Sequence, residues 1–316
     1  MMKIGVAGTG AVGSFFGGKL QQGGYDVTFL ARGKTLEVLK EQGLVIKGEK
    51  EDLHINGRFT GDPMDLAEAD LILFSVKSND TVAMGRKLHS ILKEDACVMT
   101  LQNGVDNEEI LQEIFGPDRV LSAATYVQAF KERSGQVRQQ GRVKLVMGGL
   151  APTTAVKAEQ VANLLSAAGI DTKYTGNILE KKWRKLLWNV TFNPISAAAE
   201  SRIGEVLDSR ELRQTAETIC REALDTAAAL GIEMDRERAF ATIFSNAELA
   251  REHRTSMLQD RMQGKEMEVE SMCGYVVKKA KELGVPVPAL ETIYHLLTFV
   301  NARNLRKQNA EQAPTK

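Results

Sequence analysis

The chain has 316 residues, of which 43% are apolar, and this is enough to build two hydrophobic cores. Lysine and arginine together number 41, and aspartate and glutamate together also number 41, so the overall charge attracts neither nucleic acid nor an anionic membrane. No stretch approaches the roughly 18 consecutive apolar residues of a membrane span, so we expect neither nucleic acid nor membrane as a partner.

The three cysteines, Cys97, Cys220 and Cys273, are far apart and form no Cys-x-x-Cys pattern. Their odd number and wide spacing argue against a disulfide framework and against a structural metal site. The four histidines are not spaced as a metal-ligating cluster either. We therefore expect a reducing, cytoplasmic setting and no metal.

A short apolar strand at residues 3–7 leads into a glycine-rich loop and an amphipathic helix that ends near Gln22. A second strand follows at residues 25–30. Glycines in such a loop permit a tight turn and let backbone N–H groups approach a pyrophosphate at the positive end of the helix. The pattern predicts that a dinucleotide binds to Gly8, Thr9, Gly10, Ala11, Val12 and Gly13.

The end of the second strand indicates which dinucleotide binds. An NAD site usually carries a carboxylate about 20 residues after the glycine loop, where it accepts hydrogen bonds from the ribose 2′-hydroxyl. Here the strand runs into Ala31-Arg32-Gly33-Lys34, which has two cations and no acid. Arg32 suits a bidentate contact with a 2′-phosphate, with Lys34 as an auxiliary charge, so NADP is predicted over NAD. An exposed loop arginine is the alternative.

Two further buried strands, at residues 70–76 and 97–101, end in polar residues. Ligands of doubly wound sheets bind outside the carboxyl ends of the strands. We therefore expect Lys77 to contact a phosphate, a ribose or a substrate anion, and Asn103 to present its amide to the nicotinamide. A solubilising lysine and an Asn-Gly hairpin turn are the alternatives.

The rest of the first half completes one domain. Its other elements are predicted to be a hairpin or edge strands at 44–60, antiparallel strands at 120–130 and 136–147, a covering helix at 153–167 and a strand near 170–175. The alternation of strands and helices predicts an α/β, Rossmann-like dinucleotide-binding domain over residues 1–176.

From residue 177 onward helical periodicity dominates, so an all-α domain is predicted over 177–316. One long amphipathic helix is expected over 205–231, and glycine and proline at 284–288 separate two later helices. The chain after about Leu305 is expected to be a frayed tail.

Within this second domain, Lys185, Asn189 and Asn193 recur in steps of four along an otherwise apolar helical stretch. Each step turns a helix by about 40°, so the three side chains lie on one stripe, which predicts a polar site facing them. Pro194 removes a backbone donor and predicts a kink just after Asn193. A solvated helix face that carries amides by chance is the alternative.

Together these stretches resemble the ketopantoate reductase (2-dehydropantoate 2-reductase) family, in the same order over nearly the whole chain. Gly8-x-Gly10-x-x-Gly13 matches the family's N-terminal fingerprint, and Lys77 and Asn103-Gly104 match its cofactor-side positions. The segment from Trp183 to Pro194 resembles the family's catalytic helix. Ser256-Met257-Leu258-Gln259-Asp260 resembles its substrate-serine segment, although on its chemistry alone Ser256 could equally cap a helix.

The resemblance implies a role for each matched residue. Lys185 is the proton donor, Glu268 lies near the cofactor and the lysine, and the substrate-binding residues are Asn103, Asn189, Asn193 and Ser256. It also implies a Rossmann domain followed by an all-helical domain. The implied reaction is the NADPH-dependent reduction of 2-dehydropantoate to pantoate, in pantothenate biosynthesis.

Three positions depart from the family pattern. An asparagine that follows the kinked helix in the family falls near Ile203, where no amide is present. Met267-Glu268-Val269-Glu270 replaces the usual Thr-Glu-Ile-Asp, and Cys273 replaces the asparagine beyond it. The resemblance therefore implies the reaction class, whereas these departures bear on the identity of the substrate.

Two other functions are compatible with these residues. One is a paralogous reductase of another branched 2-keto acid, and the other is a non-catalytic NADP-binding sensor. Retention of the five polar residues of the second domain argues against the sensor, because a scaffold has no chemical need for them. A homodimer is compatible with the sequence.

Overall fold

The computed structural model describes residues 2–49 and 51–311, and the chain divides into two compact units. The first unit ends at Lys181 and the second begins at Lys182, whereas the sequence predicts the boundary after Gly176. The first unit is built on a sheet with helices, and the described elements of the second unit are helical. The predicted fold class, α/β followed by all-α, is confirmed.

The elements of the first unit alternate between strands and helices. Its strands are β1 (Lys3–Ala7), β2 (Asp26–Leu30), β3 (Leu44–Lys47), β4 (Asp52–Ile55), β5 (Arg58–Thr60), β6 (Leu71–Phe74), β7 (Cys97–Thr100), β8 (Val120–Arg133), β9 (Gln136–Gly149) and β10 (Thr172–Tyr174). Its helices are α1 (Ala11–Gln22), α2 (Gly33–Gln42), α3 (Thr81–His89), α4 (Asp106–Phe115) and α5 (Ala155–Ala167), with 3-10 turns η1 (Pro63–Leu66), η2 (Ser78–Asp80), η3 (Pro117–Arg119) and η4 (Pro152–Thr154).

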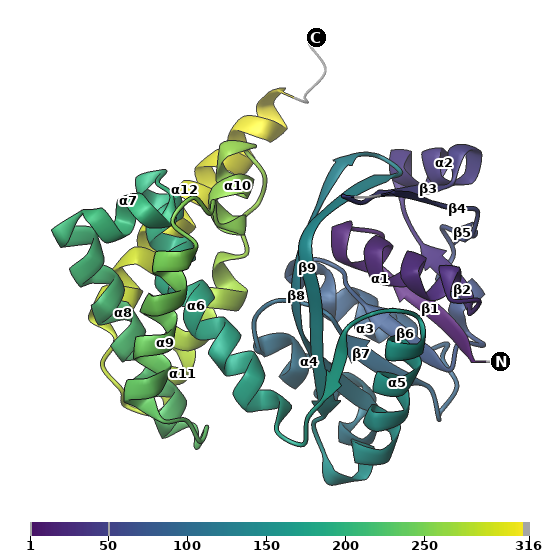
Figure 1. Ribbon diagram of the computed structural model, residues 1–316, viewed down its shortest axis with the longest axis horizontal. Helices are drawn as coiled ribbons and strands as arrows, with labels where there is room; N and C mark the ends of the chain where they lie inside the picture. Colours follow the sequence, from purple (N-terminus) through teal and green to yellow (C-terminus); the bar gives the residue numbers. More distant parts are fainter. Residues whose placement is uncertain (1, 50, 312–316) are drawn as a thin grey trace. The chain divides into compact units, whose positions relative to one another are not determined.

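The strands form one sheet whose centre is parallel (Figure 1). The parallel part has the order β5-β2-β1-β6-β7-β8, and β9 returns antiparallel to β8, as the sequence predicts. The predicted hairpin over 44–60 is only partly right. β3 and β4 form an antiparallel pair beside β9, but β5 pairs with β2 at the opposite edge of the sheet.

The strand register aligns the ends of the central strands. Ala7 of β1 pairs with Leu30 of β2 on one side and with Phe74 of β6 on the other, and Phe74 pairs in turn with Thr100 of β7. Parallel strands present their carboxyl ends at the same edge, so the segments that follow these four residues emerge side by side. This is the edge at which doubly wound sheets bind ligands.

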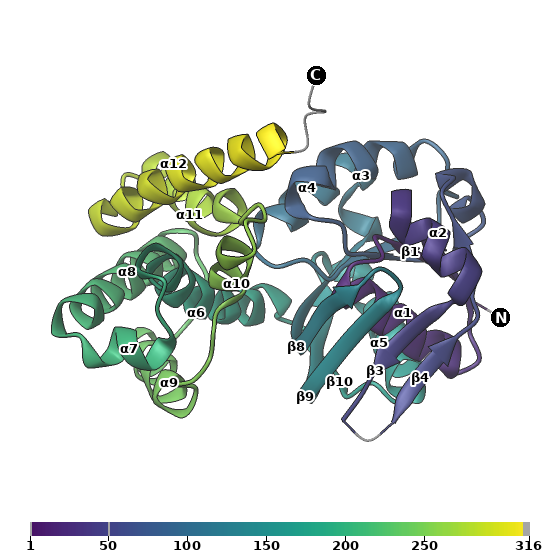
Figure 2. The same ribbon diagram turned by 90° about the horizontal axis from the view of Figure 1, so that it is seen from above.

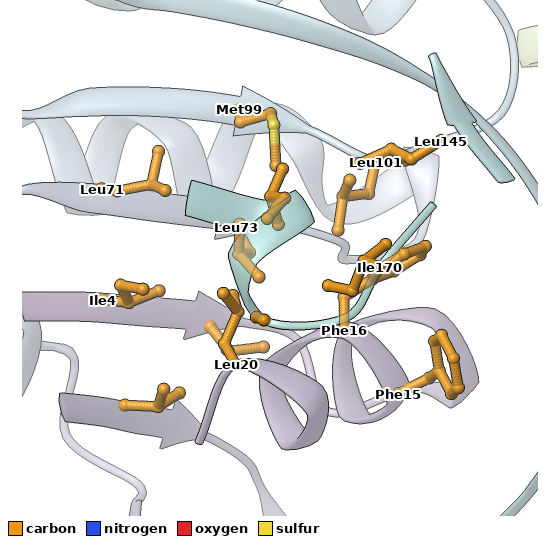
Figure 3. Close-up of a cluster of buried hydrophobic side chains, with 14 of the residues drawn as sticks. Ile4, Phe15, Phe16, Leu20, Leu71, Leu73, Met99, Leu101, Leu145 and Ile170 are labelled. Carbon is orange, nitrogen blue, oxygen red and sulfur yellow. The ribbon is translucent and has the colours of Figure 1, made fainter. Parts of the chain in front are cut away.

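The two faces of the sheet bury different side chains, because successive residues of a strand point to opposite sides. Leu71 and Leu73 share a core with Phe16 and Leu20 of α1 (Figure 3), whereas Ile72 packs in a second core that includes residues of α3 and α4. Burial of a large apolar side chain contributes roughly 1.5–3 kcal/mol, so α1 is firmly anchored to the sheet.

The second unit begins within α6. Its helices are α6 (Ile178–Ala199), α7 (Ile203–Asp208), α8 (Arg210–Ala229), α9 (Arg236–Leu249), α10 (Ser256–Met262), α11 (Tyr275–Glu282) and α12 (Pro288–Glu311), with a π-helical turn η5 (Glu270–Gly274) before α11 (Figure 2).

The single helix predicted over 205–231 is wrong, because α7 ends at Asp208 and a new helix starts at once. The hydroxyl of Ser209 accepts the backbone N–H of Leu212 at 3.2 Å and so caps α8. At the other end of the chain, α12 continues past Leu305, where the frayed tail was expected, as far as Glu311.

A buried carboxylate connects α8 to the start of α12. Glu222 is 7% exposed, and its two carboxylate oxygens accept the backbone N–H groups of Ala289 and Leu290 at 2.9 and 2.8 Å. The first N–H groups of a helix have no partners within the helix, and the helix dipole favours a negative charge there. Glu222 therefore stabilises the packing of these two helices.

Candidate active site

The glycine loop is shaped by close packing on the segment after β6. Gly8 has a φ of +102°, and a Cβ on it would lie 2.9 Å from backbone atoms of Ser75 and Val76. A Cβ on Gly13 would lie 2.1 Å from the carbonyl oxygen of Gly8, whereas a Cβ on Gly10 would meet nothing within 4 Å. Gly8 and Gly13 are therefore required by the fold, and the space beside Gly10 is open to a ligand.

The start of α1 is suited to an anion. Gly10 precedes the helix without a side-chain cap, and no acidic residue lies in the first turn. The other predicted loop residues, Thr9, Ala11 and Val12, lie in the same segment. Backbone N–H groups at a helix N-terminus attract negative charge, so these residues fit a pyrophosphate.

Arg32 lies just after β2, before the first turn of α2. Its Nη2 is 2.8 Å from Oδ2 of Asp80 in η2, and the side chains are 88% and 40% exposed, respectively. The sequence shows no acid at the end of β2, but the fold brings one there from the segment after β6. Spacing along the chain could not reveal it, because 48 residues separate the two.

A buried network joins the segments that follow β6 and β7. The Gln102 amide donates to the carbonyl of Val76 at 3.0 Å and to the hydroxyl of Thr81 at 2.7 Å. Thr81 donates to Oδ1 of Asn107 at 2.7 Å, and Nδ2 of Asn107 donates to the carbonyl of Asn103 at 3.0 Å. Sequence reasoning missed Gln102, Thr81 and Asn107. For Gln102, the sequence signal was its position directly after the buried strand predicted at residues 97–101.

This network holds the backbone beside Lys77 and at Asn103, the two residues predicted at the strand ends. Lys77 is exposed and directly precedes η2, and Asn103 is half-buried between β7 and α4. Gly104 has a φ of +81°, a conformation that glycine adopts readily, and α4 follows it. The Asn-Gly pair is therefore a strand-to-helix turn and not a hairpin.

In the second unit, α6 carries the predicted polar stripe and continues through Pro194 to Ala199. Lys185 and Asn189 are half-buried, and Asn193 is 2% exposed. The Asn193 side-chain nitrogen lies 3.5 Å from the hydroxyl oxygen of Ser256 and 3.4 Å from the sulfur of Met272. A solvated helix face is therefore excluded at Asn193.

Ser256 is the exposed first residue of α10, but it does not cap that helix. The cap is Thr255, whose hydroxyl accepts the backbone N–H of Leu258 at 3.2 Å. The capping alternative for Ser256 is therefore wrong, and its hydroxyl lies beside the amide of Asn193 instead.

The acidic segment before α11 contains a π-helical turn that the sequence does not predict. Glu268 is half-buried just before it, and Glu270 begins it. The Tyr294 hydroxyl lies 2.9 and 3.0 Å from the two carboxylate oxygens of Glu270. Single π-turns are frequent at functional sites, and this one carries Met272, whose sulfur approaches the amide on α6.

Both positions that depart from the family's asparagines lie inside the second unit. Ile203 is fully buried, and its backbone N–H donates to the carbonyl of His253 at 3.2 Å. Cys273 is also fully buried, and burial raises the pKa of its thiol to about 12, so the thiol is neutral. Neither position exposes a polar group for a substrate in this structure.

The described part of the chain shows neither a metal-ligating cluster nor a membrane-spanning helix. Among residues 2–49 and 51–311, no group of three or more His, Cys, Asp or Glu side chains is placed to hold a metal ion. Over the same residues, no helix has the length and apolar character to cross a membrane.

Comparison with known sequences identifies the family. Residues 4–152 match the family described as ketopantoate reductase PanE/ApbA, and residues 177–301 match the C-terminal region of that family. The chain belongs to the ketopantoate reductase family. A 2-dehydropantoate 2-reductase from Archaeoglobus fulgidus is 34% identical over 302 residues, which cover 96% of this chain and 99% of that protein. A 2-dehydropantoate 2-reductase from Pyrococcus horikoshii is 33% identical over 287 residues, which cover 91% of this chain and 93% of that protein.

Solved structures agree with this family assignment. A PanE/ApbA family ketopantoate reductase from Ralstonia eutropha superposes with a TM-score of 0.88 at 28% identity, covering 96% of this chain and 100% of that one. A ternary complex of D-mandelate dehydrogenase with NADH and anilino(oxo)acetate superposes with a TM-score of 0.89 at 25% identity, covering 96% of this chain and 99% of that one. The family is one of dinucleotide-dependent reductases, and its structural neighbours include a dehydrogenase that binds NADH.

Proposed function

We propose that this protein reduces 2-dehydropantoate to pantoate with NADPH, as a step of pantothenate biosynthesis. The observation that carries the proposal is the approach of Asn193 to Ser256, because two positions that match the family's substrate residues meet although 63 residues separate them. The curated relatives named 2-dehydropantoate 2-reductase support the same reaction.

The polar residues of the second unit divide the chemistry among them. Lys185 delivers a proton to the carbonyl oxygen of the substrate. Glu268 is assigned a catalytic position near this lysine and the cofactor. Asn189, Asn193 and Ser256 hold the substrate carboxylate and hydroxyl by directional hydrogen bonds. Amides and hydroxyls suit this task because they do not compete for the transferred proton.

The first unit binds the cofactor. NADPH supplies the hydride when it is bound. The loop from Gly8 to Gly13 holds the pyrophosphate, in the open space beside Gly10 and at the uncapped start of α1. Arg32 holds the 2′-phosphate with Lys34, and Lys77 and Asn103 contact the cofactor at the strand ends, with Asn103 also near the substrate.

The proposed reaction also fits a cytoplasmic location and small-molecule partners. Cys97, Cys220 and Cys273 are free and buried, which suits a reducing cytoplasm. The partners are a small 2-keto acid and the dinucleotide, and a homodimer is compatible with this function.

A second candidate function is the reduction of a different 2-keto acid. The D-mandelate dehydrogenase with a similar fold is named in complex with NADH, and this chain has apolar or buried groups at Ile203 and Cys273 where the family pattern has amides. A pocket that lacks those amides would accept a less polar substrate.

A panel of substrates tests these alternatives. The purified protein is mixed with NADPH or NADH and with 2-dehydropantoate, 3,3-dimethyl-2-oxobutanoate or 2-oxo-2-phenylacetate, and cofactor oxidation is followed. We expect the highest kcat/KM for 2-dehydropantoate with NADPH. A higher value for another acid supports the paralogue, and cofactor binding without turnover of any acid supports the sensor.

A further inference from the structure

The ion pair between Arg32 and Asp80 spans the end of the central strand β1. Arg32 follows β2 and Asp80 lies in the segment after β6, and these two strands flank β1 in the sheet. Ala7, the last residue of β1, is aligned with the last residues of both neighbours. The pair therefore connects the segments on either side of the glycine loop.

Two further cations lie near this pair, on α2 and β8. Lys34 is exposed two residues after Arg32, and Nζ of Lys131 on β8 donates to the hydroxyl of Thr35 in the first turn of α2 at 2.8 Å. Three cations thus lie at or near the start of this helix. Asp80 forms an ion pair with Arg32, one of these three cations.

We propose that Asp80 is a cofactor-specificity residue, whose carboxylate lowers the affinity for a dinucleotide with a 2′-phosphate. This inference rests on the proposed dinucleotide binding. A guanidinium binds a phosphate best through two parallel N–H groups, and Asp80 already accepts from Nη2 of Arg32. A phosphate that takes the same guanidinium must displace the carboxylate or lie beside it, where the two negative charges repel each other.

The Asp80 carboxylate does not repel a dinucleotide with a free 2′-hydroxyl, because that ribose carries no phosphate there. A carboxylate near the adenosine ribose accepts hydrogen bonds from that hydroxyl, as in sites that select NAD. Asp80 comes from the segment after β6 and not from the end of β2, but its oxygen lies 2.8 Å from the residue predicted to contact the 2′-position. Asp80 therefore disfavours NADPH and supports NADH.

If the ion pair had only a structural role, replacing Asp80 would change the two cofactor affinities alike. Pairs as exposed as this one contribute little to stability, so replacing Asp80 should leave the fold intact. A change confined to cofactor affinity thus separates the specificity role from a structural one.

The test compares dissociation constants for NADPH and NADH in the native protein, in Asp80→Asn and in Glu68→Gln. Glu68 is the matched control, since it pairs with Lys3 at 3.9 Å near the opposite ends of the parallel strands. We expect Asp80→Asn to bind NADPH about tenfold more tightly, about 1.4 kcal/mol, and NADH equally or more weakly. Glu68→Gln should leave both constants unchanged.

Two outcomes overturn the inference separately from the proposed function. If the native protein binds dinucleotides but Asp80→Asn leaves the ratio of the two constants unchanged, Asp80 has no specificity role. If Asp80→Asn gains the full tenfold in an Arg32→Ala background as well, the carboxylate does not act through the guanidinium. A native protein that binds neither dinucleotide contradicts the proposed function itself, and the inference falls with it.

Discussion

The side-chain nitrogen of Asn193 lies 3.5 Å from the hydroxyl oxygen of Ser256, and the sulfur of Met272 lies 3.4 Å from the same nitrogen. The amide is almost fully buried, so its orientation is set by these neighbours. Ser256 is an exposed residue at the start of α10. A buried amide beside the hydroxyl of an exposed serine is suited to position a small polar ligand at that hydroxyl.

Substitution of this serine should weaken discrimination between substrates. The native protein should prefer 2-dehydropantoate over its deoxy analogue, 3,3-dimethyl-2-oxobutanoate, by roughly 10- to 100-fold in kcat/KM, because the analogue lacks the hydroxyl and leaves its protein partner without that hydrogen bond in the complex. Ser256→Ala should reduce that ratio. Equal efficiencies in the native protein would favour the paralogous reductase, and an unchanged ratio in the variant would assign the hydroxyl to another residue.

Replacement of the proposed proton donor should abolish most of the turnover. Lys185→Ala is expected to lower kcat by about 10²- to 10⁴-fold while the protein remains folded and binds NADPH. Lys181→Ala is the control, since this lysine lies one turn earlier on α6 and pairs with Glu180 at 2.6 Å. A fall of less than about fivefold in Lys185→Ala, where chemistry limits the rate, would contradict the assignment.

The proposed 2′-phosphate contact can be tested by binding alone. Arg32→Ala should weaken NADPH by about 10- to 100-fold, because a hydrogen bond to a charged group contributes roughly 1.5–3 kcal/mol. NADH should be little affected, and Lys40→Ala in the last turn of α2, the helix that follows Arg32, should change neither dissociation constant. Equal affinity of the native protein for the two cofactors would refute the predicted preference for NADPH.

The buried carboxylate at the start of α12 should matter for stability. Glu222→Ala removes the acceptor of two backbone N–H groups and should lower the free energy of unfolding by about 2 kcal/mol, measured by urea denaturation. Glu217→Ala on the same helix removes only a surface pair with Arg213 and should change it by less than about 0.5 kcal/mol. Equal effects of the two substitutions would contradict a capping role.

The cysteines should be unreactive in the native protein. Cys97, Cys220 and Cys273 are buried, and burial raises the pKa of Cys220 to about 11 and of Cys273 to about 12. The thiolate is the reactive form, so a thiol reagent should label none of the three at neutral pH until the protein unfolds. Rapid labelling of Cys273 in the folded state would show that this departure from the family pattern is accessible.

Local patterns in the sequence were sufficient for the features that depend on neighbouring residues. Hydrophobic alternation and helical periodicity identified the α/β and all-α regions, and the spacing of Gly8, Gly10 and Gly13 identified the loop at the end of β1. The helical step of four placed Lys185 and Asn189 on one stripe. These features follow from backbone geometry over a few residues, which the sequence specifies directly.

Other features depended on how the elements pack. The sequence could not reveal that Asp80 reaches Arg32, that Gln102 joins two loops, or that Ser256 lies beside Asn193, because each contact joins segments far apart in the chain. Such contacts depend on strand order, register and helix packing. A shift of one residue in register turns side chains to the opposite face, so only the tertiary structure decides which polar groups meet.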